Sequence, residues 1–267
     1  MERAASFIKH HSLVVYFVLA YIFSWIMVGL IPVAFVFALL ALFGPALAAI
    51  LVTAFTEGKA GVSVLLRRVL LWRVSPVWYA VAIGVPFLVA LLVLALQALT
   101  SGAPFSISTG TPVPLLIILA LLVVGEEIGW RGFALPHLQA RYNGLIASLI
   151  LGVLWAGWHL ANASIPGLEY YWYGFPAFLV FVVAQTILFT WLANHTRGSI
   201  LLAWIFHASI NVSNSLFFIG EQVKQWWLVG AGFAAISLIV ILITGPNLGR
   251  NPQVEPEVTA MNELPAR

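Results

Sequence analysis

The chain has little charge and no cysteine. Of its 267 residues, 8% are charged and 62% are hydrophobic, whereas a soluble domain carries about a quarter charged residues. The scarcity of charge argues against an ordinary soluble domain, and the absence of cysteine excludes disulfides and a cysteine nucleophile. Apolar stretches of ~20 residues recur between short polar breaks, which is typical of a polytopic membrane protein.

The apolar stretches predict an all-α fold with about eight transmembrane helices. We expect one integral membrane domain over residues 1–244. The polar, proline-containing residues 245–267 are expected to form a disordered tail. The predicted spans are residues 12–31, 33–55, 76–99, 113–132, 144–164, 175–194, 199–219 and 225–244.

The basic residues predict the orientation of the spans. If the N-terminus is cytoplasmic, every lysine and arginine except Lys224 falls on the cytoplasmic side. The positive-inside rule therefore favours both termini in the cytoplasm. The net charge of +3 is then explained by the orientation of the spans in the membrane. No nucleic acid partner is expected.

The basic segment 58–75 contains Arg67, Arg68 and Arg73 among apolar residues at helical spacing. Such a segment fits a short amphipathic helix on the cytoplasmic membrane surface, attracted to anionic lipid. It fits a solvated basic loop equally well. The spacing does not separate these two interpretations.

A small group of polar side chains lies within the predicted spans. A charged side chain at mid-membrane costs on the order of 2.5–3.5 kcal/mol, so residues of this kind are candidates for a functional site. One buried histidine alone is more often a hydrogen-bonding group between helices. Several polar side chains at compatible depths favour a functional site instead. The group comprises Glu126, Glu127, Arg131, His159, His207 and Asn211.

Helical spacing gives the two adjacent acids of the segment VVGEEIGWRG different roles. Glu127 and Arg131 are four residues apart with the acid first, which is the favourable order for an ion pair on one helix face. Glu126 points ~100° away from Glu127. The spacing therefore predicts a structural role for Glu127 and leaves Glu126 as the free carboxylate.

The turn near Tyr142 brings Glu126 and His159 toward each other. Both lie ~24 Å from that turn along their helices, so they can face one another across a hairpin. If Arg131 lies at the interface, Glu126 is only ~8 Å deeper. This depth estimate predicts a cavity in the cytoplasmic half of the bilayer that opens toward the cytoplasm.

Three further residues can share that cavity. His207 is ~12 Å deep by the same count, since its span begins at Ser199. Asn211 follows His207 by four residues and lies on the same helix face. Trp155 precedes His159 by four residues and is expected to form a wall of the pocket.

This group has the composition of a hydrolytic site. A carboxylate facing a histidine can activate water for attack on a carbonyl, and a second histidine with an amide can stabilise the resulting oxyanion. Alternatively, Glu126, His159 and His207 could bind Zn²⁺ with one position open for water. Because the sequence has no HExxH helix, we favour a site without a cofactor.

Three motifs carry a family resemblance. Glu126-Glu127-Ile-Gly-Trp-Arg131 matches EExxxR, Trp155-Ala-Gly-Trp-His159 is similar to FxxxH, and His207-Ala-Ser-Ile-Asn211 matches HxxxN. In this order they resemble the CPBP family of CAAX proteases and bacteriocin-processing enzymes, which includes abortive-infection and lysostaphin-resistance-like proteins. The resemblance covers residues 113–215 and departs from the family pattern at Trp155, where the motif has phenylalanine.

The resemblance implies an eight-helix intramembrane glutamic endopeptidase, similar to CAAX prenyl protease 2. Glu126 and His159 would activate water, and His207 and Asn211 would bind the oxyanion. Glu127 and Arg131 would support them.

The expected partners are the lipid bilayer and a membrane-embedded or lipidated peptide, and the expected location is the bacterial cell membrane. The alternative is a non-catalytic membrane protein that gives bacteriocin immunity or binds a partner. In that case the polar cluster would only hold the helices together.

Overall fold

A computed structural model describes residues 8–101, 112–217 and 222–250. Within these ranges the chain is helical and forms no strands, and eight helical segments are long and apolar enough to cross a membrane. The predicted all-α, eight-span architecture is confirmed. The spans are Ser12–Gly29, Gly44–Leu70, Pro76–Thr100, Val113–Gln139, Gly144–Ser164, Phe175–His195, Ile200–Phe217 and Gln222–Thr244.

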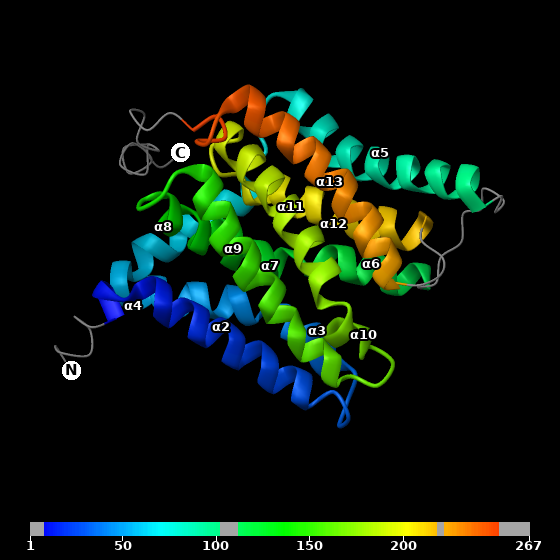
Figure 1. Ribbon diagram of the computed structural model, residues 1–267. Coiled ribbons are helices and arrows are strands. Elements are labelled where there is room, and N and C mark those ends of the chain that lie inside the picture. The colour runs from blue at the N-terminus through cyan, green and yellow to red at the C-terminus, as the bar shows by residue number, and fades with distance from the viewer. Residues whose placement is uncertain (1–7, 102–111, 218–221, 251–267) are drawn as a thin grey trace.

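Several spans are assembled from more than one helical element (Figure 1). The fourth span is a rod in which the π-helical turn η2 separates two short α-helices from a third. In chain order the elements are α2 (Ser12–Gly29), α3 (Val36–Ala41), α4 (Gly44–Arg67), η1 (Arg68–Leu70), α5 (Pro76–Ser101), α6 (Val113–Leu122), α7 (Val124–Gly129), η2 (Trp130–Ala134), α8 (Leu135–Gln139), α9 (Gly144–Trp158), η3 (His159–Ser164), α10 (Tyr170–Tyr173), α11 (Phe175–His195), α12 (Ile200–Phe217) and α13 (Gln222–Thr244).

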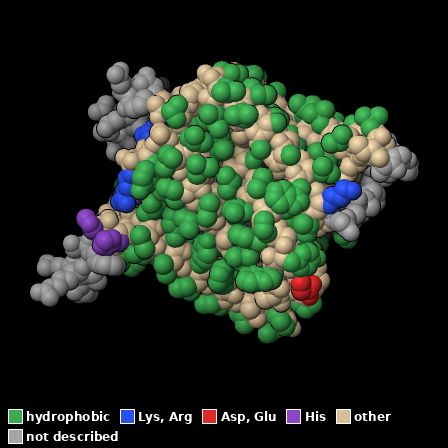
Figure 2. All heavy atoms as spheres, in the orientation of Figure 1, with side chains coloured by type: hydrophobic (Ala, Val, Ile, Leu, Met, Phe, Trp, Pro, Cys, Tyr) green, Lys and Arg blue, Asp and Glu red, His purple; other side chains and the backbone are tan. Residues whose placement is uncertain are grey.

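Successive spans run back and forth between two ends of the bundle. One end, here named the terminal end, holds the start of α2, the end of α13 and the connections at residues 68–75, 140–143 and 196–199 (Figure 1). The opposite end, named the α3–α10 end, holds α3, η3 and α10. Figure 2 shows hydrophobic side chains over most of the visible face, as expected of a surface in contact with lipid.

The second predicted span, residues 33–55, is wrong in its bounds. A short helix, α3, precedes it, and the spanning helix α4 begins at Gly44. The Ser24 hydroxyl of α2 donates a 2.7 Å hydrogen bond to the carbonyl of Ala41. A Cβ on Gly44 would lie 2.0 Å from that hydroxyl oxygen, so α2 fits against this corner because the residue is glycine. Hydropathy alone does not reveal such a contact.

The basic segment 58–75 begins with a short helix of its own. Non-helical backbone at Gly58, where φ is 71° and ψ is −162°, separates it from the first part of α4, and this helix ends at Arg67. Residues 71–75 are non-helical. Arg68 donates hydrogen bonds to the carbonyls of Gly132 (2.8 Å) and Gly198 (2.9 Å). Arg68 therefore connects α4 to η2 and to the turn before α12, rather than facing lipid headgroups.

Residues 245–250, which were expected to belong to a disordered tail, are ordered in the structure. They form turns, and Leu248 is completely buried. The Asn194 amide donates to the carbonyls of Asn247 and Leu248 at 3.2 and 3.1 Å. The prediction is wrong for these six residues because their backbone finds partners on α11, and residues 251–267 lie outside the described residues.

Two glycines let the acid-bearing helix α7 closely approach the start of α4 and the residues just before it. A Cβ on Gly125 would lie 2.8 Å from the carbonyl oxygen of Leu42, and one on Gly129 would lie 2.4 Å from Pro45 Cβ. The four-residue spacing is the GxxxG pattern that favours close packing of membrane helices. The sequence GEEIG contained this signal, and the pair of acids lies between the two glycines.

Candidate active site

Four predicted site residues surround one cavity. Its volume is about 230 Å³, and its lining includes Glu126, His159, His207 and Asn211. These side chains come from α7, η3 and α12, which are separated in the sequence. Because one water needs only ~10–15 Å³ by such a measure, the cavity has room for several waters.

Glu127 forms the predicted ion pair and a second interaction that the spacing did not reveal. Its Oε1 atom accepts a 3.0 Å hydrogen bond from Nη1 of Arg131. Nδ1 of His207 lies 2.7 Å from the same oxygen. The carboxylate thereby connects α7, η2 and α12 in the interior, and all three side chains are buried.

Glu126 has a different partner. Its Oε2 atom accepts a 2.9 Å hydrogen bond from the indole Nε1 of Trp155, and among the described side chains it makes no ion pair. Glu126 is 3% exposed and lines the cavity. The separation of the two acids that helical spacing predicted is therefore present in the structure.

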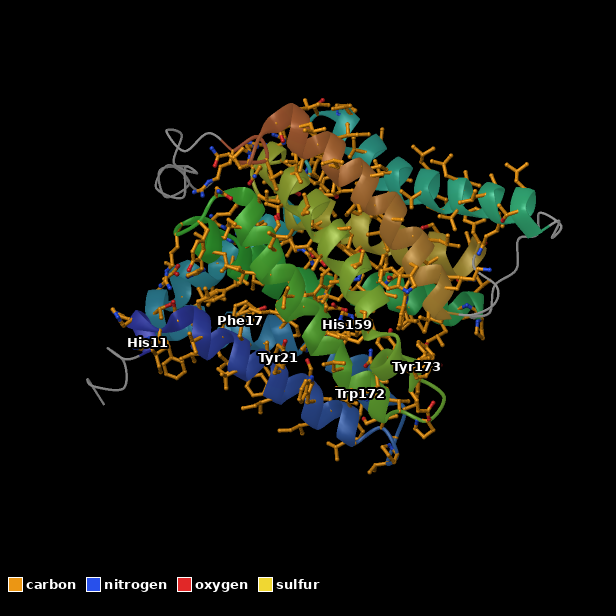
Figure 3. The ribbon with its side chains drawn as sticks, in the orientation of Figure 1. His11, Phe17, Tyr21, His159, Trp172 and Tyr173 are labelled. Atoms are coloured by element: carbon orange, nitrogen blue, oxygen red, sulfur yellow. The ribbon has the colours of Figure 1, made fainter. Side chains whose placement is uncertain are left out.

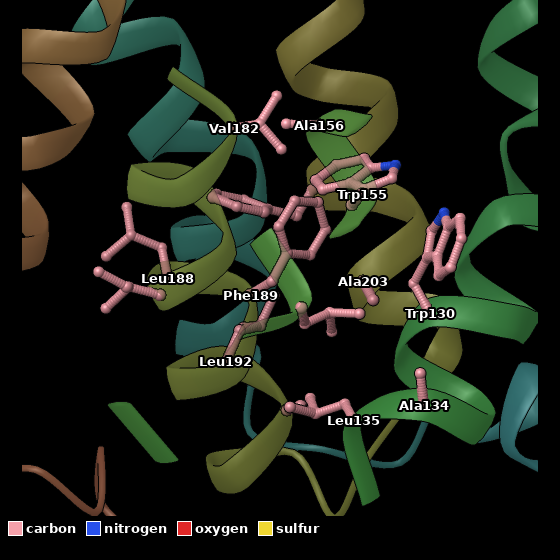
Figure 4. Packing of buried hydrophobic residues seen from close by; sticks show 14 of the residues in the cluster. Trp130, Ala134, Leu135, Trp155, Ala156, Val182, Leu188, Phe189, Leu192 and Ala203 are labelled. Carbon is pink, nitrogen blue, oxygen red and sulfur yellow. The ribbon is translucent and has the colours of Figure 1, made fainter. Parts of the chain in front are cut away.

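Trp155 lies behind Glu126 instead of forming a wall of the cavity. It is 1% exposed and does not belong to the cavity lining. The ring centroid of Trp155 lies 4.1 Å from the Arg131 guanidinium carbon, and Phe189 covers that guanidinium at 3.6 Å. Figure 4 shows the two aromatic rings side by side in the packed interior. The cation is thus held between aromatic faces as well as by Glu127.

The histidine that was predicted to act as a base has a defined orientation. Nδ1 of His159 lies 2.8 Å from the backbone carbonyl oxygen of Trp155. A carbonyl only accepts hydrogen bonds, so Nδ1 carries the hydrogen and Nε2 of the neutral ring is unprotonated. Figure 3 shows His159 toward the end of the bundle where Trp172 and Tyr173 lie exposed.

The cavity lies on the side away from the chain ends. Its lining includes Ile31, Ala38, Asn162 and Tyr171, all near the α3–α10 end. The depth estimate was wrong because it took Arg131 as interfacial, whereas this side chain is 1% exposed. If the termini are cytoplasmic, the cavity lies toward the opposite side of the membrane. The predictions of cytoplasmic termini and of a cavity that opens toward the cytoplasm therefore cannot both be correct.

The predicted zinc ligands do not form a metal site in this arrangement. Over residues 8–101, 112–217 and 222–250, no three His, Asp or Glu side chains form a group that could hold a metal ion. Glu126, His159 and His207 share the cavity, but Glu126 accepts from Trp155 and His207 faces Glu127. These contacts involve Oε2 of Glu126 and Nδ1 of His207, and they leave Oε1 of Glu126 and Nε2 of His207 unoccupied by them.

The comparison with protein families agrees with the three motifs. Residues 108–213 match the family model described as type II CAAX prenyl endopeptidase Rce1-like. Over this part the chain is similar to the CPBP family. The predicted resemblance is confirmed, and the match includes every CPBP motif that lines the cavity.

Two curated relatives extend the comparison. The chain is 38% identical to "CAAX prenyl protease 2" of Methanococcus maripaludis over 127 residues, which are 45% of this chain and 46% of that protein. It is 29% identical to "Lysostaphin resistance protein A" of Staphylococcus haemolyticus over 157 residues, or 54% of this chain and 41% of the relative. The chain thus spans less than half the length of each relative.

The buried ion pair leads to a stability prediction. Glu127→Ala would leave the Arg131 guanidinium and the His207 ring without their carboxylate partner in the interior. Removing one partner of a buried pair costs about 3–5 kcal/mol. We expect a markedly lower unfolding midpoint for the purified protein in detergent, followed by tryptophan fluorescence.

Glu169→Ala is the matched control, because this acid is exposed and makes no ion pair among the described residues. Its midpoint should change little. Equal midpoints for the two variants would show that the Glu127 pair does not stabilise the bundle.

Proposed function

We propose that this protein is an intramembrane endopeptidase that hydrolyses a peptide bond in a membrane-associated or lipidated peptide. The family match and the protease-named relative support a CAAX protease-like function. The observation that carries the proposal is the convergence of Glu126, His159, His207 and Asn211 on one cavity.

In the proposed reaction, Glu126 and His159 hold a water in the cavity. The Glu126 carboxylate accepts a proton from this water as the water oxygen attacks the carbonyl carbon of the substrate. His159 orients the water through its unprotonated Nε2. Cleavage of the carbon–nitrogen bond then returns the proton from Glu126 to the leaving amine, so the carboxylate is regenerated.

His207 and Asn211 are proposed to stabilise the oxyanion. The Asn211 amide can donate a hydrogen bond directly. His207 donates through Nδ1 to Glu127, so its Nε2 carries a hydrogen only when the ring is protonated. The contact with Glu127 fixes the orientation of this ring, which gives Glu127 a positioning role in addition to its structural one.

The single most informative variant is Glu126→Gln. Its amide oxygen can still accept from Trp155, so we expect a folded protein with an unchanged unfolding midpoint. Loss of the general base should lower turnover by on the order of 10²–10⁴-fold. The measurement is cleavage of lipidated and apolar peptides in proteoliposomes, read by mass spectrometry, together with peptides that accumulate in cell membranes.

Glu57→Gln serves as the control, because Glu57 is an exposed acid on α4 away from the cavity. It should cleave at the wild-type rate. Full activity of purified Glu126→Gln would disprove the assigned role of this residue.

The relative named for lysostaphin resistance favours a second candidate, a non-catalytic immunity or partner-binding protein. In that case the polar cluster only holds helices together. Neither wild type nor Glu126→Gln would then release peptide products, and loss of function in variants would follow loss of folding. The same experiment therefore separates the two candidates.

We also propose that the reaction needs no bound metal. Because no three His, Asp or Glu side chains among the described residues form a metal-holding group, strong chelators such as EDTA and 1,10-phenanthroline should leave turnover unchanged. A known zinc protease in the same liposomes provides the positive control for metal removal. Loss of activity that stoichiometric zinc restores would establish the zinc mechanism instead.

A further inference from the structure

The two ends of the bundle differ in charge. Within the described residues, the α3–α10 end carries Lys224 and Glu169 as its ionic side chains. Figure 2 shows the same asymmetry, with most visible Lys and Arg side chains beside the chain ends. The basic residues of the terminal end are Lys9, Lys59, Arg67, Arg68, Arg73, Arg141, Arg197 and Arg250.

This asymmetry indicates which end faces the cytoplasm. Short cytoplasmic connections of membrane proteins are enriched in lysine and arginine. The terminal end therefore fits the cytoplasmic face, and the α3–α10 end fits the outer face. The exposed Trp172 and Tyr173 on α10 agree with a position at a membrane–water interface, where such aromatic side chains are enriched.

The cavity extends from the site toward the α3–α10 end. Glu126 and His207 lie at mid-helix in their spans, whereas Asn162 and Ile165 line the cavity in and just after η3. On α2 the lining runs from Ser24 past the helix end at Gly29. A path of lining residues therefore connects the carboxylate to this end of the bundle.

The interior between the site and the terminal end is closed by packed side chains. Four apolar side chains in this region are at most 2% exposed: Leu135, Leu138, Leu192 and Ile200. Figure 4 shows Leu192 near Phe189 and Leu135 further from that ring, both within this packed interior. Arg68 adds hydrogen bonds to backbone carbonyls in the same region. Apolar packing of this density leaves no room for water.

From these observations we infer that the cavity receives water and substrate from the extracytoplasmic side of the membrane. The substrate is then a membrane-inserted or lipidated peptide whose scissile bond lies in the outer half of the bilayer. The identity of the occupant as a substrate rests on the proposed function. The direction of access rests on the cavity and the charges alone.

The absence of cysteine makes the direction of access directly measurable. Three single-cysteine variants suffice. Ser164→Cys is exposed at the α3–α10 end, Asn162→Cys lines the cavity, and Ser75→Cys is exposed at the terminal end. Each is expressed in bacterial cells and treated with a membrane-impermeant maleimide before or after the membrane is permeabilised.

We expect Ser164→Cys and Asn162→Cys to react in intact cells, and Ser75→Cys to react only after permeabilisation. Reaction of Ser75→Cys in intact cells would overturn the orientation. Protection of Asn162→Cys in intact cells, while Ser164→Cys reacts, would overturn access to the cavity from outside. The wild-type chain gives the background.

The labelling result does not depend on proteolysis. If the variants label as expected but no peptide is cleaved by the wild type, the proposed function fails and the direction of access stands. If peptides are cleaved but Ser75→Cys labels from outside, the function stands and the inferred direction fails.

Discussion

The indole of Trp155 is the contact on which the geometry of the site depends. Its N–H donates to Glu126, its ring covers the Arg131 guanidinium, and its ring centroid lies 5.3 and 5.8 Å from those of His207 and His159. One buried side chain thus touches residues from α7, η2, η3 and α12. A rigid aromatic ring fixes these groups relative to each other without adding a further charge to the interior.

That contact explains how the protein keeps two adjacent carboxylates in the interior. Isolated charges are costly in an apolar environment, so each acid needs polar partners. Glu127 has Arg131 and His207, whereas Glu126 has only the neutral indole as its described partner. The neutral donor orients Glu126 without pairing it with a cation, as the proposed role of this carboxylate as a base requires. The close approach of α7 to α4 at Gly125 and Gly129 keeps both acids within the bundle.

The sequence alone predicted those features that depend on local residue spacing. Hydropathy gave eight spans, and the four-residue interval between Glu127 and Arg131 predicted their ion pair. Residue spacing did not predict contacts between distant segments, such as the contact of His207 with Glu127, which lies 80 residues away in the sequence. No periodicity along one helix specifies which neighbour it packs against.

Two further errors have the same origin. The second span was set too early because hydropathy does not register the fit of Gly44 against Ser24. The depth of the site was measured from Arg131 as though this arginine reached the interface. A buried arginine and an interfacial one look identical in sequence, and only the carboxylate and rings around Arg131 distinguish them.

The most direct test of this account is the turnover of Trp155→Phe, measured per folded molecule. Phenylalanine retains an aromatic ring but removes the donor to Glu126, and a hydrogen bond to a charged group contributes about 1.5–3 kcal/mol. We expect a fall in turnover of roughly 10- to 100-fold, since 1.36 kcal/mol corresponds to tenfold in rate. Trp204→Phe, which loses a hydrogen bond to the Ala120 carbonyl outside the cavity lining, should keep wild-type turnover. Wild-type turnover in Trp155→Phe would contradict the claim that this indole positions Glu126.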